Sequence, residues 1–154
     1  MKKSAQPKIH ISVKKQELTL KSGRQKLAAY PISTSRFGLG PEEGSLKTPT
    51  GRFRIAEKIG DGMPLGTVFK SRRPVKATKK MLRDEDLVMT RILWLDGIDP
   101  GNANTYERFI YIHGTNHEGQ IGEPASHGCV RMRNSDLVEL FERVGIDTPV
   151  MINA

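Results

Sequence analysis

The chain has 154 residues, and its 25 lysines and arginines against 17 aspartates and glutamates give a formal net charge of +8. A chain of this length can bury one hydrophobic core and is too short for two, so we expect a single domain over residues 1–154. Hydrophobic residues make up 36% of the chain and no apolar run approaches the ~18 residues of a membrane span, which excludes disordered and membrane-spanning classes.

The first third of the chain predicts β structure. Residues 8–20 contain two runs of alternating apolar and polar side chains with a polar break between them, which predicts a hairpin. Residues 26–33 predict a third strand. Residues 34–55 then collect glycine, proline, serine and threonine before the alternation of Phe53 and Ile55. Long loops inside compact domains are often functional, so this loop is a candidate wall of a site.

Residues 60–86 are highly charged, lack periodicity and are expected to be irregular. Residues 70–83 hold seven basic side chains, and residues 1–83 as a whole carry 20 basic against 5 acidic ones. Such a run can bind nucleic acid, but no aromatic residue interleaves it and no nucleic-acid motif accompanies it. We therefore expect no nucleic-acid partner, and interpret the run as a solvated face or as an attractor for a small polyanionic substrate.

The second half predicts two buried strands, a helix and a last strand. Residues 87–95 and 108–114 are short runs rich in β-branched or aromatic residues, and the second places His113 at the end of a strand. Residues 134–145 form the one convincing helix, with Asn134 or Ser135 as its cap and Gly145 after its end. Its apolar stripe consists of Leu137, Leu140, Phe141 and Val144. Residues 148–153 predict the final strand, so the fold class is mainly β, a sandwich or barrel with one main helix near the C-terminus.

The sequence ASHGCV, residues 125–130, contains the only cysteine of the chain. A cysteine attacks acyl groups as the thiolate and needs a base, and His113, His117 and His127 all lie within sixteen residues of Cys129. Gly128 permits a tight turn that could direct the amides of residues 127–129 at one oxyanion. Each such donor lowers an acyl-transfer barrier by about 3 kcal/mol.

Two other interpretations of these residues stay open at this point. A lone cysteine is usually a small buried side chain with a structural role. His113, His117, His127 and Cys129 could also supply four metal ligands, although i, i+4 spacing brings two ligands together only on a helix and this segment is rich in turns. A single cysteine cannot form an internal disulfide, so the redox compartment stays undetermined.

The segment IHGTNHEGQIGEPASHGCVRM, residues 112–132, resembles the active-site signature of the YkuD, or L,D-transpeptidase, catalytic domain family, in which a histidine is followed after a loop by Ser/Thr-His-Gly-Cys. Two upstream segments match as well: KTPTGRF at 47–53 corresponds to a Thr-Pro-Thr-Gly element, and STSRFGLG at 33–40 precedes it. The resemblance extends from about residue 27 to residue 152 and implies the mainly β, sandwich-like or barrel-like fold of that family.

The resemblance also implies roles for individual residues. Cys129 would be the nucleophile and His113 its base, with the Gly114 carbonyl orienting the imidazole. His127, Gly128 and Cys129 would donate to the oxyanion, and Ser126 would belong to the supporting turn. Arg131 stands where some family members have asparagine; it would be either a fork for a substrate carboxylate or part of a structural salt bridge.

The implied reaction is acyl transfer on peptidoglycan stem peptides, without metal or organic cofactor. The enzyme would cleave the bond between the third residue and the terminal D-alanine of a tetrapeptide, and β-lactams of the carbapenem class would acylate its thiol. The charged start of residues 1–20 lacks the apolar core of an export signal, so we expect a cytoplasmic enzyme that hydrolyses muropeptides during wall recycling, an L,D-carboxypeptidase.

Two alternative functions stay in view. The first is a periplasmic transpeptidase that makes 3-3 cross-links or exchanges D-amino acids, and the second is a non-catalytic domain that binds muropeptides. We expect no membrane partner, and the sequence does not indicate an oligomeric state.

Overall fold

The computed structural model describes residues 6–154. Its strands belong to a ten-stranded sheet. They are β1 (Pro7–Ser12), β2 (Glu17–Ser22), β3 (Gln25–Ser33), β4 (Gly51–Ile59), β5 (Val68–Lys70), β6 (Arg73–Val75), β7 (Val88–Gly97), β8 (Tyr111–Gly114), β9 (Val130–Met132) and β10 (Pro149–Asn153). The α-helices are α1 (Lys79–Asp84) and α2 (Asn134–Arg143), and short 3-10 helices span Pro100–Asn102 and Glu118–Gln120.

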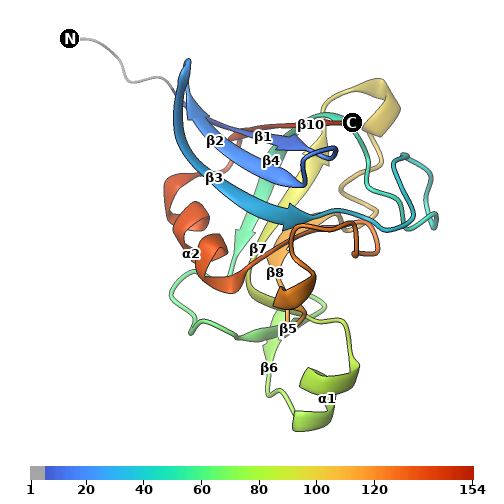
Figure 1. Ribbon diagram of the computed structural model, residues 1–154, viewed down its shortest axis with the longest axis vertical. Coiled ribbons are helices and arrows are strands. Elements are labelled where there is room, and N and C mark those ends of the chain that lie inside the picture. The colour runs from blue at the N-terminus through green and yellow to red at the C-terminus, as the bar shows by residue number, and fades with distance from the viewer. Residues whose placement is uncertain (1–5) are drawn as a thin grey trace.

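The sheet closes on itself as a barrel (Figure 1). Its strand order is β4-β10-β1-β2-β3-β9-β8-β7-β5-β6, and β4 also pairs with β7. Residue pairs across this closing seam include Phe53 with Gly97 and Ile59 with Ile92. The β5–β6 hairpin extends from the other end of β7, so β5, β6 and α1 lie at the end of the molecule away from β1 and β2.

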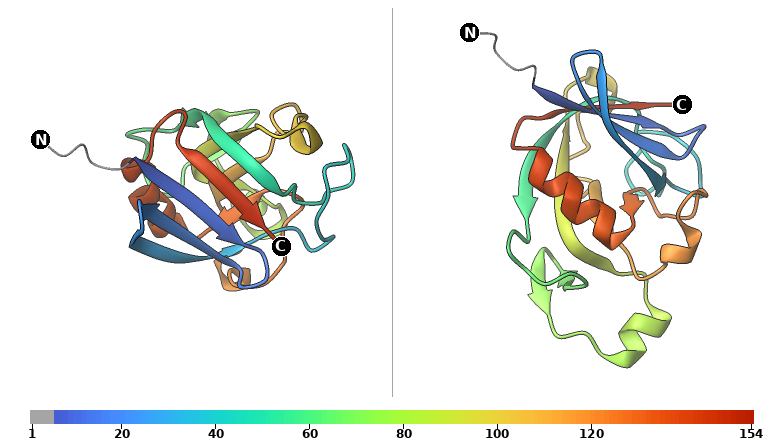
Figure 2. Two further views of the ribbon diagram at one scale, coloured as in Figure 1. Left: turned by 90° about the horizontal axis from the view of Figure 1, so that it is seen from above. Right: turned by 60° about the vertical axis from the view of Figure 1, so that its left-hand side comes forward.

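Alternating side chains of the strands fill the barrel, and α2 covers part of it. Helix α2 lies alongside β7 and β8 (Figure 2) and adds its apolar stripe to the same core. The largest fully buried side chains of this core include Phe53, Phe141, Ile9, Ile11, Leu18, Leu20, Ile32, Ile55, Leu93, Leu95 and Ile112. Burial of this apolar surface is the main source of folding free energy.

The mainly β fold with one main helix, expected from the alternation pattern, is confirmed. Three details differ. The stretch 60–86 is not wholly irregular, because β5 pairs with β7, and β6 and α1 follow it. The strand expected at 108–114 begins only at Tyr111, since residues 103–109 form turns. Asn134 does not cap α2: the N-cap residue is Arg133, which makes no side-chain cap bond.

Strand β9 was not expected from the sequence. Its three residues are too few for a visible alternation pattern, and pairing with β8 on one side and β3 on the other defines it. Within residues 6–154, no helix is both long and apolar enough to span a bilayer.

Candidate active site

The pairing of β8 with β9 places the predicted nucleophile and base on one face of the barrel wall. The two strands are parallel, with Ile112 opposite Val130 and His113 opposite Arg131. Ile112 and Val130 are fully buried in the core. Because side chains alternate along a strand, His113 and Arg131 point to the outer face. Cys129, two residues before Arg131, shares that side.

Cys129 and His113 line one cavity of about 140 Å³. The complete lining is Asp86, Leu87, Val88, His113, Ser126, His127, Cys129 and Arg131. The structure thus brings together the predicted nucleophile and base with three other predicted site residues, Ser126, His127 and Arg131. Gly114 and Gly128 are neighbours of these residues in the chain.

The Cys129 side chain is half-buried at the cavity wall. Its Sγ accepts a hydrogen bond from the Tyr111 amide at 3.3 Å and donates to the Phe109 carbonyl at 3.4 Å. Burial raises the pKa of the Cys129 thiol to about 11, although the Tyr111 amide acts in the opposite direction. At neutral pH the resting group is therefore a thiol, and it needs a base at the moment of attack.

His113 is suited to act as that base. Its side chain is buried, and its Nδ1 lies 2.5 Å from the Gly114 carbonyl oxygen. Burial lowers the pKa of His113, so the imidazole is neutral at pH 7. Since Nδ1 must donate to the carbonyl, the lone pair of the neutral ring is on Nε2.

Among the described residues, the His113 ring makes no hydrogen bond to the Cys129 sulfur. Both residues line the same cavity, and their direct approach stays a prediction. Catalytic hydrogen bonds are often long in a ligand-free enzyme and shorten when substrate binds.

Asn134 supports the segment that orients His113. Its Nδ2 donates to the Thr115 carbonyl at 2.8 Å, and its Oδ1 accepts from the Thr90 hydroxyl at 2.6 Å. Between these bonds lies Gly114, where an added Cβ would come within 2.1 Å of the Asn134 Oδ1. Only glycine fits there. The sequence predicted Asn134 or Ser135 as a helix cap, and the buried position of Asn134 beside Gly114 is visible only in the fold.

The turn before β9, expected to present amides to an oxyanion, contains a glycine in a left-handed conformation. Gly128 has φ +126°, a region that favours glycine. Ser126 is buried; its hydroxyl donates to the Cys129 carbonyl at 2.6 Å and accepts from the Gly128 amide at 3.3 Å. Within residues 6–154, the amides of His127 and Cys129 donate to no protein atom. Two of the three expected donors are thus free to face a substrate, whereas the third is bonded to Ser126.

The loop expected to form a wall does support this turn. Thr48, in the Thr-Pro-Thr-Gly segment, donates from its hydroxyl to the Gly128 carbonyl at 2.9 Å and accepts from the Ser35 amide at 2.9 Å. The Ser126 amide donates to the Thr34 carbonyl at 2.9 Å. Both upstream segments therefore contact the turn that carries Cys129.

Arg131 is paired with a residue that the sequence analysis did not single out. Its Nη2 lies 2.7 Å from Asp86 Oδ2, its Nη1 donates to Gln120 at 3.0 Å, and its side chain is only 3% exposed. The same Asp86 oxygen lies 3.0 Å from His127 Nδ1. Of the two interpretations of Arg131, the geometry matches the structural salt bridge. In the sequence, the only sign of this pairing was that Asp86 is an acidic residue directly before the strand predicted at 87–95.

Charge balance keeps Asp86 ionised. Burial alone would raise the pKa of this carboxyl, but the Arg131 charge and hydrogen bonds from His127 and Arg131 outweigh it, so the pKa is lowered. The carboxylate therefore holds Arg131 and His127 together at neutral pH.

Three of the four residues of the metal-site alternative, His113, His127 and Cys129, line one cavity, but their side chains have other partners. Cys129 faces β8, His113 contacts Gly114, and His127 contacts Asp86. His117 begins the short 3-10 helix at 118–120. In the described part of the chain, no three His, Cys, Asp or Glu side chains are arranged to hold a metal ion.

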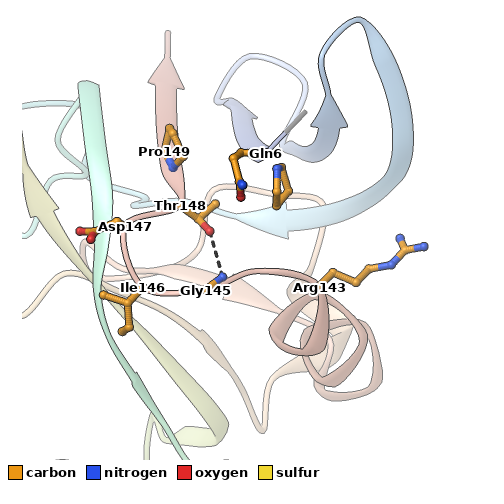
Figure 3. A pocket seen from close by; sticks show the side chains of 8 residues that line it. Gln6, Arg143, Gly145, Ile146, Asp147, Thr148 and Pro149 are labelled. Carbon is orange, nitrogen blue, oxygen red and sulfur yellow. Dashed lines mark hydrogen bonds between the residues drawn. The ribbon is translucent and has the colours of Figure 1, made fainter. Parts of the chain in front are cut away.

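A larger cavity of about 510 Å³ lies elsewhere, between the end of α2 and the start of β10 (Figure 3). Its lining residues are Gln6, Pro7, Arg143, Gly145, Ile146, Asp147, Thr148 and Pro149. A hydrogen bond from the Gly145 amide to the Thr148 hydroxyl, 2.9 Å long, shapes the loop there. This lining has neither a nucleophilic thiol nor a histidine, so the chemistry of acyl transfer points to the smaller cavity.

Comparisons with known proteins agree with this geometry. The profile of the YkuD family, described as the L,D-transpeptidase catalytic domain, matches residues 6–152. The putative L,D-transpeptidase YkuD of Bacillus subtilis is 27% identical over 94% of this chain, and the match covers 65% of that relative's length. This chain thus spans just under two thirds of that relative.

Solved structures share the fold. An L,D-transpeptidase from Xylanimonas cellulosilytica superposes with a TM-score of 0.64 at 19% identity, covering 99% of this chain and 63% of the other. L,D-transpeptidase 3 from Mycobacterium tuberculosis, solved with a faropenem-derived adduct, gives a TM-score of 0.63 at 15% identity, covering 98% of this chain and 61% of the other.

Proposed function

Since the chain belongs to the YkuD family of L,D-transpeptidase catalytic domains, we propose that it transfers the acyl group of a peptidoglycan tetrapeptide stem to Cys129 and then to water. The observation that carries this proposal is the single cavity lined by Cys129 and His113 next to a turn with two free amides. A nucleophile, a base and an oxyanion site are the minimum for acyl transfer.

The first half-reaction forms a thioester. His113 Nε2 takes the proton of the Cys129 thiol as the sulfur attacks the carbonyl carbon of the third stem residue. The amides of His127 and Cys129 stabilise the resulting oxyanion. The intermediate collapses when the imidazolium returns its proton to the departing nitrogen, so the bond to D-alanine breaks and D-alanine leaves.

The second half-reaction hydrolyses the thioester. His113 now takes a proton from water, whose oxygen attacks the same carbon, and the thiol is regenerated with release of a tripeptide. The cavity at the His113 side measures about 140 Å³, and one water occupies about 30 Å³ in the liquid. The cavity therefore leaves room for a water beside the imidazole, as hydrolysis requires. A cytoplasmic place for this hydrolysis stays a prediction.

An amine acceptor is the second candidate. The B. subtilis relative is named a putative L,D-transpeptidase, and an amine reaching the thioester from the opposite side of Cys129 would complete a cross-link or a D-amino acid exchange. Mass spectrometry of a disaccharide tetrapeptide incubated with the protein, with and without excess D-methionine, separates the two. Tripeptide in both samples supports hydrolysis, whereas dimers or D-methionine adducts would replace that proposal with transpeptidation.

A separate experiment distinguishes enzyme from binding domain. We expect imipenem or faropenem to add its mass to the intact protein, because the M. tuberculosis relative carries a faropenem-derived adduct. The adduct should be lost in Cys129→Ala and retained in His10→Ala, which removes a histidine on β1 outside the site. A wild-type protein that forms no adduct and releases no D-alanine would indicate a non-catalytic muropeptide-binding domain.

A further inference from the structure

A second cavity lies close to the thiol. It has a volume of about 370 Å³ and is lined by Phe69, Ser71, Arg72, Val88, Ile92, Phe109 and Tyr111. Two of these residues also hold the nucleophile, through the Tyr111 amide and the Phe109 carbonyl. Val88 lines both cavities. The second cavity is therefore within reach of a substrate whose scissile bond lies at Cys129.

The cavity has one charged wall residue, and the backbone that presents it is strained. Ser71 and Arg72 form the two-residue turn between β5 and β6, with φ values of 49° and 64°. Such turns strongly favour Asn-Gly, because positive φ is costly for residues with a Cβ. Strain of about 1–3 kcal/mol at a residue persists only when the surrounding structure enforces it, and it concentrates at binding and catalytic sites.

Aromatic rings fix the position of the Arg72 guanidinium. Its centre lies 5.1 Å from the ring centroids of Trp94 and Phe109, and its Nη1 donates to the Tyr111 hydroxyl at 3.2 Å. Trp94 and Tyr111 pack edge to face at 5.4 Å, which makes the platform rigid. Phe109 is itself held at φ 56° and is 49% exposed, so its ring lies at the mouth of the cavity.

In the part of the chain that the structure describes, the Arg72 guanidinium has no direct ion pair, although its hydrogen bond to Tyr111 and the nearby Glu57 charge help to raise its pKa. Over residues 6–154, no carboxylate lies within ion-pair distance of its guanidinium. Arg131 differs in this respect, because its two terminal nitrogens already donate to Gln120 and Asp86. A planar guanidinium stacked on aromatic rings, with donors left over, suits a planar carboxylate.

We propose that this cavity binds a carboxylate of the substrate stem peptide, with Arg72 as the residue that pairs it. The inference rests on the proposed function for the identity of the peptide. Arg72 would then pair the substrate carboxylate, a role that the sequence had suggested for Arg131. Such a role would give a reason for an arginine at a φ of 64°, a conformation that favours glycine.

The test measures equilibrium binding, so that it does not depend on turnover. Tetrapeptide, and tetrapeptides with each carboxylate amidated in turn, are titrated by calorimetry into the Cys129→Ala protein. The same set is titrated into Cys129→Ala combined with Arg72→Gln, and into Cys129→Ala combined with Arg73→Gln. Arg73 is the exposed next residue of the same hairpin, so its replacement is matched in charge and position.

We expect one amidation to weaken binding about tenfold in the Cys129→Ala protein, the range of a partly solvated charge-assisted hydrogen bond. That amidation should have no effect when Arg72 is glutamine and the full effect when Arg73 is glutamine. A merely structural role of Arg72 would weaken all the peptides alike.

Two results would overturn the inference, and they differ in what else they imply. In the first, the tetrapeptide binds tightly, and each amidation weakens binding as much with Arg72→Gln as without it. This result would contradict a carboxylate site at Arg72 and leave the proposed function standing. No binding of any tetrapeptide to Cys129→Ala, with no D-alanine released by the wild type, would remove the proposed substrate and this inference with it.

Discussion

The backbone amide of Tyr111 donates to the sulfur of Cys129 at 3.3 Å. This bond joins β8 to the turn before β9, so the proposed nucleophile is held by the strand that also carries His113. Because the ladder between these strands is parallel, the outer faces of both coincide and the polar residues of the site gather there. The proposed site thus lies on the barrel wall, outside the packed interior.

We expect the thiol to react slowly with neutral electrophiles at pH 7. With a pKa of about 11, only about one thiol in ten thousand is a thiolate at that pH, and the thiolate is the reactive form. Iodoacetamide alkylation, followed by intact mass, should accelerate steadily from pH 7 to pH 10. A rate that levels off below pH 8 would show a thiolate already formed and would contradict the neutral resting pair.

Acylation by a β-lactam or peptide should instead show an acid limb set by His113. Burial disfavours the imidazolium and lowers the pKa of His113 below its usual 6.5, so the neutral base persists to lower pH. The rate constant for adduct formation should therefore fall only below pH 6.5 as the ring takes up a proton. A midpoint above 7 would mean that the imidazolium is favoured in the folded enzyme.

Replacing Asp86 by asparagine should destabilise the protein by about 2 kcal/mol. The change leaves Arg131 buried with only Gln120 as partner, and removing one partner of a buried ion pair costs about 3–5 kcal/mol. The smaller value reflects the 37% exposure of the Asp86 side chain. Urea unfolding of both proteins measures the difference.

The pH dependence of that difference follows from the lowered pKa of Asp86. A carboxyl with a depressed folded pKa stabilises the protein above its unfolded pKa of about 3.9, and loses this contribution as pH falls through the folded value. The two proteins should therefore converge below pH 4. Glu85→Gln is the control, because its pair with Lys70 is exposed and should contribute less than about 1 kcal/mol at any pH.

Asn134→Ala should impair acylation more than folding. The substitution removes the amide that bonds the Thr90 hydroxyl and the Thr115 carbonyl, and we expect the adjacent Gly114 carbonyl, which contacts His113, to lose its fixed position. Loss of a buried hydrogen-bonded group costs about 1–3 kcal/mol, and we expect acylation of the folded protein to slow about tenfold or more. Intact mass over time gives the rate, and thermal unfolding gives the stability.

Asn102→Ala is the matched control for this variant. Asn102 is equally buried and braces the barrel at the other end of β7, donating to the Thr50 and Arg52 carbonyls at 3.0 Å. It should cost similar stability and leave acylation per folded molecule within about twofold. Equal slowing in both variants would show that Asn134 acts through general stability alone.

What the sequence could predict is set by distance along the chain. His113 and Cys129 are sixteen residues apart and belong to one contiguous signature, so their partnership was predictable together with the glycine turn. Strands with clear alternation, such as β1 and β2, were predictable for the same local reason.

Residues placed by tertiary pairing were not predictable. Asp86 reaches Arg131 across 45 positions, and Asn134 reaches Thr90 across 44. Arg72 is brought to Tyr111 only because a three-residue strand pairs with β7. Such contacts leave no periodic trace, and a charged run such as 70–83 looks the same whether it is solvated or folded onto a site.

Thr48 links the Thr-Pro-Thr-Gly segment to the proposed oxyanion turn. Thr48→Val preserves shape and removes the hydroxyl that donates to the Gly128 carbonyl and accepts from the Ser35 amide. Two buried groups lose their partner, at about 1–3 kcal/mol each, and Gly128 loses a restraint on its φ of +126°. We expect acylation to slow about tenfold, because the amides of the turn are no longer held in place for the oxyanion. Thr48→Ser keeps the hydroxyl and should acylate within about twofold of wild type. If valine and serine acylate at equal rates while the valine variant is less stable, Thr48 supports the fold and has no part in positioning the turn.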